Sequence, residues 1–197
     1  MKADEVREHL KKFRVGIAGA GGLGSNCAML LARAGVGTLV ICDFDTVEKS
    51  NLNRQFYFLH QCGMKKTEAL KENLKMIDDD IIVIAHDIKL DRENIPEVFT
   101  GCDAIVEAFD RAEMKEMIIE AVQTEMPGVP LIVASGLAGW GRNDSIRSRK
   151  IDDNLYVCGD ESQEVSEENP PLAPRVVIVA AMQANLVVEI LMNRKIV

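Results

Sequence analysis

The chain has 197 residues, of which 47% are hydrophobic and 27% charged, and these values are typical of a globular protein with a sizeable core. Its formal net charge of −8 excludes a protein that binds the phosphate backbone through a basic surface, so we expect no nucleic-acid partner. Because no uninterrupted apolar run approaches the ~20 residues that span a bilayer, and the charged start does not resemble a secretory signal, we expect no membrane partner and a cytoplasmic location.

Short β-branched runs alternate with amphipathic stretches along most of the chain, a pattern typical of parallel βαβ units. Strands are predicted, in chain order, over residues 14–19, 38–42, 80–85, 103–108 and 130–134. Helices are predicted from Gly22 to the glycines at 35 and 37, and over residues 65–77, 92–99 and 112–124.

The rhythm changes after Gly141. A strand of different orientation is predicted over 145–150, and the acidic stretch 152–168 is predicted to be a solvated loop. A strongly apolar helix is predicted over 175–192, buried against the sheet or against a second subunit. The pattern therefore predicts one domain over residues 1–197: a doubly wound, Rossmann-like α/β fold with a mostly parallel sheet, flanking helices and antiparallel strands toward the C-terminal part.

A glycine-rich hexad, Gly-Ala-Gly-Gly-Leu-Gly at 19–24, joins the first predicted strand to the first predicted helix. Glycines permit a tight turn there and let backbone N–H groups approach a phosphate, which the positive end of the helix also attracts. Asp43 ends the second strand and is placed to accept hydrogen bonds from a ribose, with Asp45 as the alternative. These features alone fit NAD, FAD and ATP equally.

The polar loop that follows Asp43 favours ATP. Transfer at a phosphate requires neutralisation of the phosphate charge, which Arg54 can supply bidentately and Lys66 as a movable point charge. Taken singly, each residue is better explained without a site: Arg54 by a surface ion pair and Lys66 by a solvated position.

Together the motifs resemble those of the ThiF/MoeB family, the bacterial relatives of ubiquitin-activating enzymes. The resemblance extends from Val15 to Val188 and rests on GAGGLG, AGVGTLVICDFDTVEKSNLNRQ, GMKK and EAFD. The later segment PRV…QAN is similar to that of the short, zinc-free ThiF-like subgroup, so no structural zinc is expected.

The resemblance implies a role for each matching residue. Gly19, Gly21, Gly22 and Gly24 would shape the nucleotide loop, and Asp43 would hold the ribose. The triphosphate would be contacted by Asn51, Arg54, Gln55 and Lys66. Asp110 would bind the Mg²⁺ that bridges the phosphates, although an Asp at this position is also a common helix N-cap. Arg54, Lys66 and Asp110 are thereby the candidate catalytic residues.

The implied chemistry is ATP-dependent adenylation of the C-terminal glycine carboxylate of a small sulfur-carrier protein. The resemblance favours a ThiS-like carrier ending in Gly-Gly, as in thiamin biosynthesis. The apolar terminal helix and a compact, one-sided site predict a homodimer. The glycine-rich segment 135–141 is a candidate wall for the channel that admits the carrier tail.

Several departures from the family leave alternatives open. The C-x-x-C pairs of the longer members are absent, Arg111 stands where Asn is common, and Cys158 is a weak candidate for a covalent link to the carrier. Arg7 is a candidate for a contribution across the dimer interface. The rival functions are a dinucleotide-dependent oxidoreductase and a non-catalytic carrier-binding scaffold.

Overall fold

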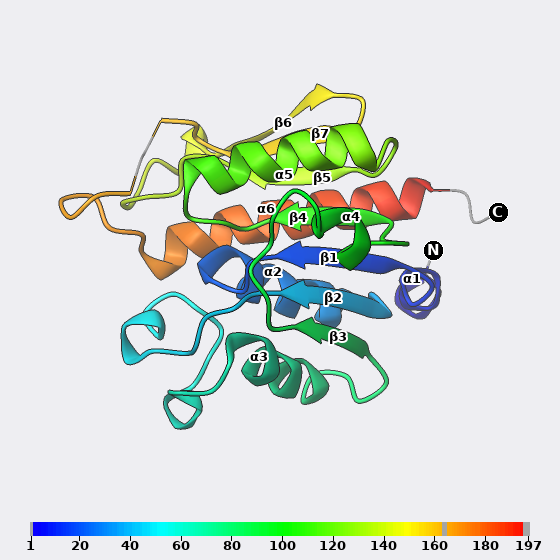
Figure 1. The fold of residues 1–197 in the computed structure, drawn as a ribbon, viewed down its shortest axis with the longest axis horizontal. Helices are drawn as coiled ribbons and strands as arrows, with labels where there is room; N and C mark the ends of the chain where they lie inside the picture. Colours follow the sequence, from blue (N-terminus) through cyan, green and yellow to red (C-terminus); the bar gives the residue numbers. More distant parts are fainter. Residues whose placement is uncertain (1, 163–164, 195–197) are drawn as a thin grey trace.

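The computed structural model describes residues 2–162 and 165–194 and contains one seven-stranded sheet in the order β3-β2-β1-β4-β5-β7-β6 (Figure 1). All neighbouring strands are parallel except the β6–β7 pair, which is antiparallel. The strands are β1 (Arg14–Ala18), β2 (Thr38–Cys42), β3 (Ile82–His86), β4 (Ala104–Glu107), β5 (Leu131–Ala134), β6 (Arg147–Asp152) and β7 (Leu155–Gly159). The predicted mostly parallel, Rossmann-like sheet with an antiparallel pair near the C-terminus is confirmed.

Helices cover both faces of the sheet. They are α1 (Ala3–Leu10), α2 (Gly22–Ala34), α3 (Lys66–Lys75), α4 (Ile95–Val98), α5 (Ala112–Glu125) and α6 (Ala173–Asn193). One buried cluster joins the sheet to α1, α2, α3 and α6, and a second joins it to α4 and α5. Figure 1 shows α5 in front of the sheet, with α2 and α6 behind it.

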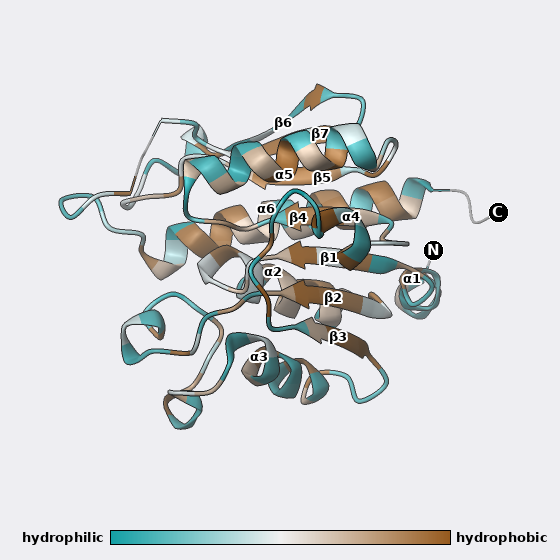
Figure 2. Ribbon diagram, in the orientation of Figure 1, coloured by the Kyte–Doolittle hydropathy of each residue, from teal (hydrophilic) through white to brown (hydrophobic). Residues whose placement is uncertain are grey.

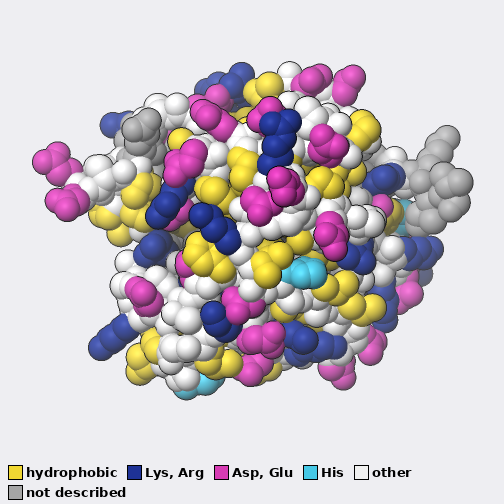
Figure 3. Space-filling view, in the orientation of Figure 1, with side chains coloured by type: hydrophobic (Ala, Val, Ile, Leu, Met, Phe, Trp, Pro, Cys, Tyr) yellow, Lys and Arg dark blue, Asp and Glu magenta, His cyan; other side chains and the backbone are white. Residues whose placement is uncertain are grey.

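The apolar side chains follow the pattern expected for a two-faced sheet. Figure 2 shows hydrophobic residues along the central strands and polar residues on the outer turns of the helices. On the face that carries α4 and α5, acidic and basic side chains are interspersed with hydrophobic ones (Figure 3). Because helices bury both sides of a parallel sheet, its strands read as nearly continuous apolar runs.

Three elements differ from the sequence prediction. β7 lies inside the stretch that was predicted to be a solvated acidic loop, because its side chains Leu155 and Cys158 are buried and its backbone pairs with β5. The helix predicted over 92–99 is only the single turn α4. The N-terminal helix α1, which buries Leu10, was not predicted.

α6 is long and apolar enough, by length and composition alone, to cross a membrane. Its contacts are those of a core helix. Gln183 is fully buried and donates from its side-chain amide to the carbonyl oxygens of Glu107 (2.9 Å) and Ile132 (3.2 Å) at the sheet. The other side of α6 leaves Ile178 36% exposed, with Met182 and Leu186 half-buried. The prediction that α6 is buried against the sheet is confirmed for one side of the helix.

Candidate functional site

The glycine loop lies at the carboxyl ends of the parallel strands, where open α/β sheets bind their ligands. α2 begins at Gly22, as predicted. Gly19 has φ +100°, and Gly24 approaches it so closely that a Cβ on Gly24 would lie 1.8 Å from the Gly19 carbonyl oxygen. Gly21 is different, because a Cβ there would meet only the side-chain amide of Gln55, at 3.8 Å. The loop is therefore closed by its own backbone at Gly24 and open at Gly21.

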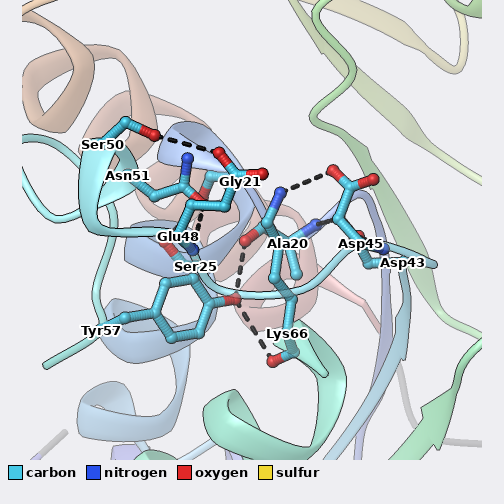
Figure 4. Close-up of polar contacts among 10 residues, drawn as sticks. All are labelled: Ala20, Gly21, Ser25, Asp43, Asp45, Glu48, Ser50, Asn51, Tyr57 and Lys66. Carbon is cyan, nitrogen blue, oxygen red and sulfur yellow. Dashed lines mark hydrogen bonds and ion pairs between the residues drawn. The ribbon is translucent and has the colours of Figure 1, made fainter. Parts of the chain in front are cut away.

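Asp43 holds this loop against the end of β2. Its carboxylate accepts hydrogen bonds from the backbone N–H of Ala20 (2.6 Å) and of Asp45 (2.8 Å). Figure 4 shows the Asp43 side chain facing Ala20. The structure thus places Asp43 at the glycine loop, as the sequence predicted, and adds a contact with the loop backbone.

Lys66 is the first residue of α3, and only 8% of its side chain is exposed. Its ammonium group lies 2.7 Å from the Asp45 carboxylate, which is half exposed. Lys66 is not a solvated surface lysine, because its charge is held within the site by a partner from the polar loop. Asp45, the alternative ribose acid, is the partner that fixes Lys66.

Tyr57 connects the glycine loop to α3 and is a site residue that sequence reasoning missed. Its buried hydroxyl lies 2.7 Å from the Ala20 carbonyl oxygen and 3.3 Å from that of Lys66 (Figure 4). Burial raises the pKa of the Tyr57 phenol well above its usual value, so the hydroxyl keeps its proton and acts as a donor. An aromatic residue with a polar tip inside the polar loop is the only signal the sequence offers.

Arg54 is half-buried and lies beside the glycine loop. Its aliphatic Cγ would be 3.6 Å from a Cβ on Gly22. The guanidinium donates only to neutral oxygens, the Asn53 side chain (2.8 Å) and the Ser50 carbonyl (3.3 Å). Among the described residues it has no acidic partner, so the alternative of a surface ion pair is not what the structure contains.

Asn51 and Gln55 flank Arg54 in the same loop. The Asn51 side-chain oxygen accepts from the Glu48 backbone N–H (3.0 Å), which fixes the short helical turn Lys49–Asn51. Gln55 is buried, and its side-chain oxygen has no hydrogen-bond partner among the described residues. A buried amide without a partner is rare in native proteins and is typical of a group that awaits a ligand or water.

Asp110 lies in the turn between β4 and α5. This turn adjoins the glycine loop, because the carbonyl oxygen of Ala108, two residues before Asp110, would lie 2.9 Å from a Cβ on Gly19. Its side chain is exposed and makes no hydrogen bond or ion pair with any described residue. The N-cap of α5 is Arg111, without a side-chain capping bond, so the alternative helix-cap role for Asp110 is wrong.

No group of three or more His, Cys, Asp or Glu that could hold a metal occurs among residues 2–162 and 165–194. A single carboxylate is nevertheless what Mg²⁺ uses when most of its remaining ligands are phosphates and water. Asp110 fits that requirement, since its oxygens are exposed and are not committed to contacts within the described chain.

A pocket of about 240 Å³ lies at the start of α6, lined by Ala138, Gly139, Trp140, Arg142, Asn169 and Arg175. The buried Arg175 guanidinium pairs with the buried Asp160 carboxylate and donates to the Gly141 carbonyl (2.6 Å). The next residue, Val176, would be 3.0 Å from a Cβ on Gly22. The predicted segment 135–141 therefore lines a pocket beside the glycine loop, and the Arg175–Asp160 pair that supports it was missed.

Two further sequence candidates lie outside the site around the glycine loop. Cys158 is fully buried in β7, and burial raises the pKa of its thiol to about 12, which disfavours the nucleophilic thiolate. Arg7 in α1 pairs with Asp78 (2.6 Å) at the opposite end of the strands from the glycine loop.

The comparisons with known sequences agree with one another on the family. The sequence pattern of the ThiF family matches residues 2–197. The adenylyltransferase and sulfurtransferase MOCS3 of Caenorhabditis briggsae is 32% identical over 191 residues, covering 93% of this chain and 47% of the relative. The molybdopterin-synthase adenylyltransferase of Haemophilus influenzae is 36% identical over 139 residues, covering 69% of this chain and 56% of the relative. The chain spans about half the length of these curated relatives.

Solved structures share the fold. The Escherichia coli tRNA N6-threonylcarbamoyladenosine dehydratase TcdA, in complex with ATP, superposes with a TM-score of 0.86 at 18% identity, covering 96% of this chain and 89% of TcdA. Escherichia coli MccB, in complex with AMPCPP and MccA, gives a TM-score of 0.73 at 25% identity, covering 94% of this chain and 58% of MccB. At such identity, the likeness to TcdA establishes the fold alone.

Proposed function

The chain belongs to the ThiF family, and we propose that residues 1–197 form one adenylyltransferase domain that uses ATP to activate the C-terminal carboxylate of a small ubiquitin-like carrier protein. The observation that supports this proposal is a set of polar side chains around the glycine loop, each of which lacks a charged partner or a hydrogen bond within the described chain. Arg54 has no acidic partner among the described residues, the Gln55 side-chain oxygen has no partner, and Asp110 makes no hydrogen bond or ion pair. Gln55 is the buried residue of the three, and buried polar atoms that serve only the fold are as a rule hydrogen-bonded.

In this proposal ATP lies along the glycine loop. Gly19, Gly21, Gly22 and Gly24 shape the loop, and the open position at Gly21 lets a phosphate approach the start of α2. Asp43 accepts from the ribose. Asn51, Arg54, Gln55 and Lys66 face the triphosphate, with Lys66 moving from Asp45 to a phosphate oxygen.

The proposed reaction forms a bond between a carboxylate oxygen of the carrier and the α-phosphorus, and breaks the bond between that phosphorus and the oxygen leading to the β-phosphate. The products are an acyl-adenylate and pyrophosphate, and no protein nucleophile is required. Arg54 and Lys66 stabilise the charge that develops on the phosphates and hold them in line with the carboxylate. Mg²⁺ bound by Asp110 would supply further charge neutralisation on the phosphate oxygens.

We propose that the pocket beside the glycine loop takes the tail of the carrier. Its walls include Ala138 and Gly139, which leave room for an extended Gly-Gly segment, and Trp140, which is 69% exposed and offers an apolar surface to the carrier. Val176 packs close to Gly22, so this pocket adjoins the phosphate-binding loop.

A ThiS-like carrier with a Gly-Gly terminus, used in thiamin biosynthesis, is the partner that the PRV…QAN segment favours. The names of the relatives described above point to other systems, including molybdopterin synthase. A panel of purified carriers, ThiS-like, MoaD-like and others ending in Gly-Gly, would identify the partner. The measurement is ATP–pyrophosphate exchange in the presence of Mg²⁺.

Exchange that requires Mg²⁺ and one carrier supports the proposal. ATP binding without exchange by any carrier would favour the non-catalytic scaffold, and NADH binding without ATP binding would favour the oxidoreductase. A variant carrier that lacks the terminal glycine is the matched negative control, because it keeps the carrier fold and removes only the reacting carboxylate from its position.

We further propose that the protein is a cytoplasmic homodimer. The support for the dimer is the outer side of α6, where the apolar side chains Ile178, Met182 and Leu186 are at least partly exposed. Light scattering at the concentration used for the exchange assay tests the dimer, and a monomer would contradict it.

A further inference from the structure

Glu107, the last residue of β4, is a fully buried acid to which the proposed reaction gives no role. Its carboxylate accepts four hydrogen bonds from three donors. One oxygen accepts from the Phe109 backbone N–H (2.6 Å) and from Lys115 (2.7 Å), and the other from Lys115 (2.9 Å) and the Ala134 backbone N–H (3.2 Å). Both oxygens therefore face donors only.

Only an ionised carboxylate satisfies this environment completely. A glutamine would present one accepting oxygen and one NH₂ group, and the NH₂ group would face a donor in either orientation. Burial raises the pKa of Glu107, while Lys115 and the two backbone N–H groups oppose that rise. The side chain of Lys115 is one quarter exposed and supplies the neutralising charge from α5.

These contacts converge on the turn that carries Asp110. The bond to Phe109 fixes the chain one residue before Asp110, and Lys115 anchors the first turns of α5 to the same carboxylate. Gln183 from α6 holds the Glu107 carbonyl from the other side. The turn is thereby fixed to the end of β4, to β5 and to both flanking helices, whereas the Asp110 side chain itself stays uncommitted.

We propose that Glu107 is a positioning residue that, through Phe109 and Lys115, fixes the β4–α5 turn so that Asp110 presents its carboxylate to the metal ion of the ATP complex. The inference rests on the proposed function for the metal and the nucleotide, and adds the residue that orders their ligand. Removal of a residue that hydrogen-bonds a metal ligand typically costs 10–100-fold in metal affinity, and Glu107 acts one step further away, through Phe109 and Lys115.

The test compares Glu107→Gln with Asp103→Asn. Asp103 precedes the same strand at its opposite end, where it accepts from the Arg14 backbone N–H (2.9 Å) and pairs with Arg194 (3.1 Å). Its substitution therefore weakens a strand-end carboxylate contact far from the turn, one that is partly exposed rather than buried. For each variant we would measure Mn²⁺ binding by electron paramagnetic resonance in the presence of a non-hydrolysable ATP analogue, and hydrogen exchange of the Phe109 amide.

In Glu107→Gln we expect the Mn²⁺ concentration for half-saturation to rise about tenfold or more, and the Phe109 amide to exchange faster. In Asp103→Asn both should match the wild type. A folded Glu107→Gln with wild-type Mn²⁺ affinity overturns the inference alone. Failure of the wild type to bind Mn²⁺ with the analogue overturns the proposed function as well.

Lys115→Gln is the second variant if Glu107→Gln does not fold. It removes the charge partner from the partly exposed side and leaves the two backbone donors in place. A rise in the half-saturating Mn²⁺ concentration in the same direction supports the inference. Unchanged Mn²⁺ affinity together with unchanged exchange of the Phe109 amide overturns it.

Discussion

The two sides of the candidate site are built differently. The first side, residues 19–66, is held by contacts within one continuous stretch of the chain: Asp43 with Ala20, Lys66 with Asp45 and Tyr57 with both Ala20 and Lys66. The second side, formed by the turn 107–115 and the segment 135–176, is held through buried carboxylates, Glu107 (0% exposed) and Asp160 (1% exposed), whereas the Asp45 carboxylate of the first side is 51% exposed. Arg175 meets Asp160 and Gly141, and Glu107 meets Ala134.

This difference indicates whether substitutions on each side should affect ligand binding or the stability of the fold. The first side keeps several charges at its surface, so its substitutions should affect ligand binding before folding. The second side depends on two buried ion pairs, Arg175–Asp160 and Lys115–Glu107. Removal of one partner of such a pair leaves a buried charge without compensation, so substitutions there should affect stability as well.

Arg175→Met should give the largest effect and tests the claim that the second side depends on buried charge. The substitution removes the Arg175 guanidinium from its buried pair with Asp160, whose side chain is 1% exposed, and we expect the free energy of unfolding to fall by about 3–5 kcal/mol. Urea denaturation measures it. Arg149→Met is the matched control, because Arg149 pairs with Glu161 at the surface and its loss should lower the free energy of unfolding far less than the loss of Arg175. Equal losses in the two variants would contradict the comparison.

Asp110→Ala should separate function from stability on the second side. Because the Asp110 side chain is exposed and makes no hydrogen bond to a described residue, the free energy of unfolding should change by no more than about 0.5 kcal/mol. The rate of ATP–pyrophosphate exchange should fall about a hundredfold or more if Asp110 holds the metal. Normal exchange in this variant would remove Asp110 from the proposed site.

Two glycine substitutions test the first side. Gly21→Ala has room for its methyl group, so we expect normal folding and ATP binding weakened about tenfold, because the methyl would occupy the place of a phosphate. Gly24→Ala would bring Cβ to within 1.8 Å of the Gly19 oxygen and should also destabilise the fold. Thermal unfolding and calorimetric titration with ATP measure the two effects. Wild-type ATP affinity in Gly21→Ala would show that no phosphate approaches there.

The smallest effect is expected at Cys158, whose buried thiol should hardly react with an alkylating reagent in the native protein. Since burial raises the pKa of its thiol to about 12, the thiol should stay protonated at pH 8 and react with iodoacetamide only as pH approaches that value or the protein unfolds. Cys62 is exposed and serves as the internal control for labelling. Mass spectrometry of the native protein at pH 8 should find the label on Cys62 alone. Rapid labelling of Cys158 would restore the idea of a covalent role.

The sequence predicted the sheet well and placed the glycine loop and Asp43 where the structure has them, because these features depend on local patterns. Apolar runs of strand length, a glycine hexad between strand and helix, and an acid at the next strand end are short-range signals. The prediction failed at β7, because a strand within an acidic stretch is recognised only when β5 pairs with it. It also missed α1 and gave α4 more length than its single turn.

By itself the sequence determined the alternation of strands and helices along the chain, the position of the glycine loop, and the family resemblance that points to Arg54, Lys66 and Asp110. Only the tertiary structure decided that Lys66 is buried against Asp45, that Asp110 is not a helix cap, and that Glu107 and Arg175 are buried ion-pair partners. The physical reason is that burial and charge pairing arise between segments that only the fold brings together, so the free energy of each charge depends on neighbours that no local pattern specifies.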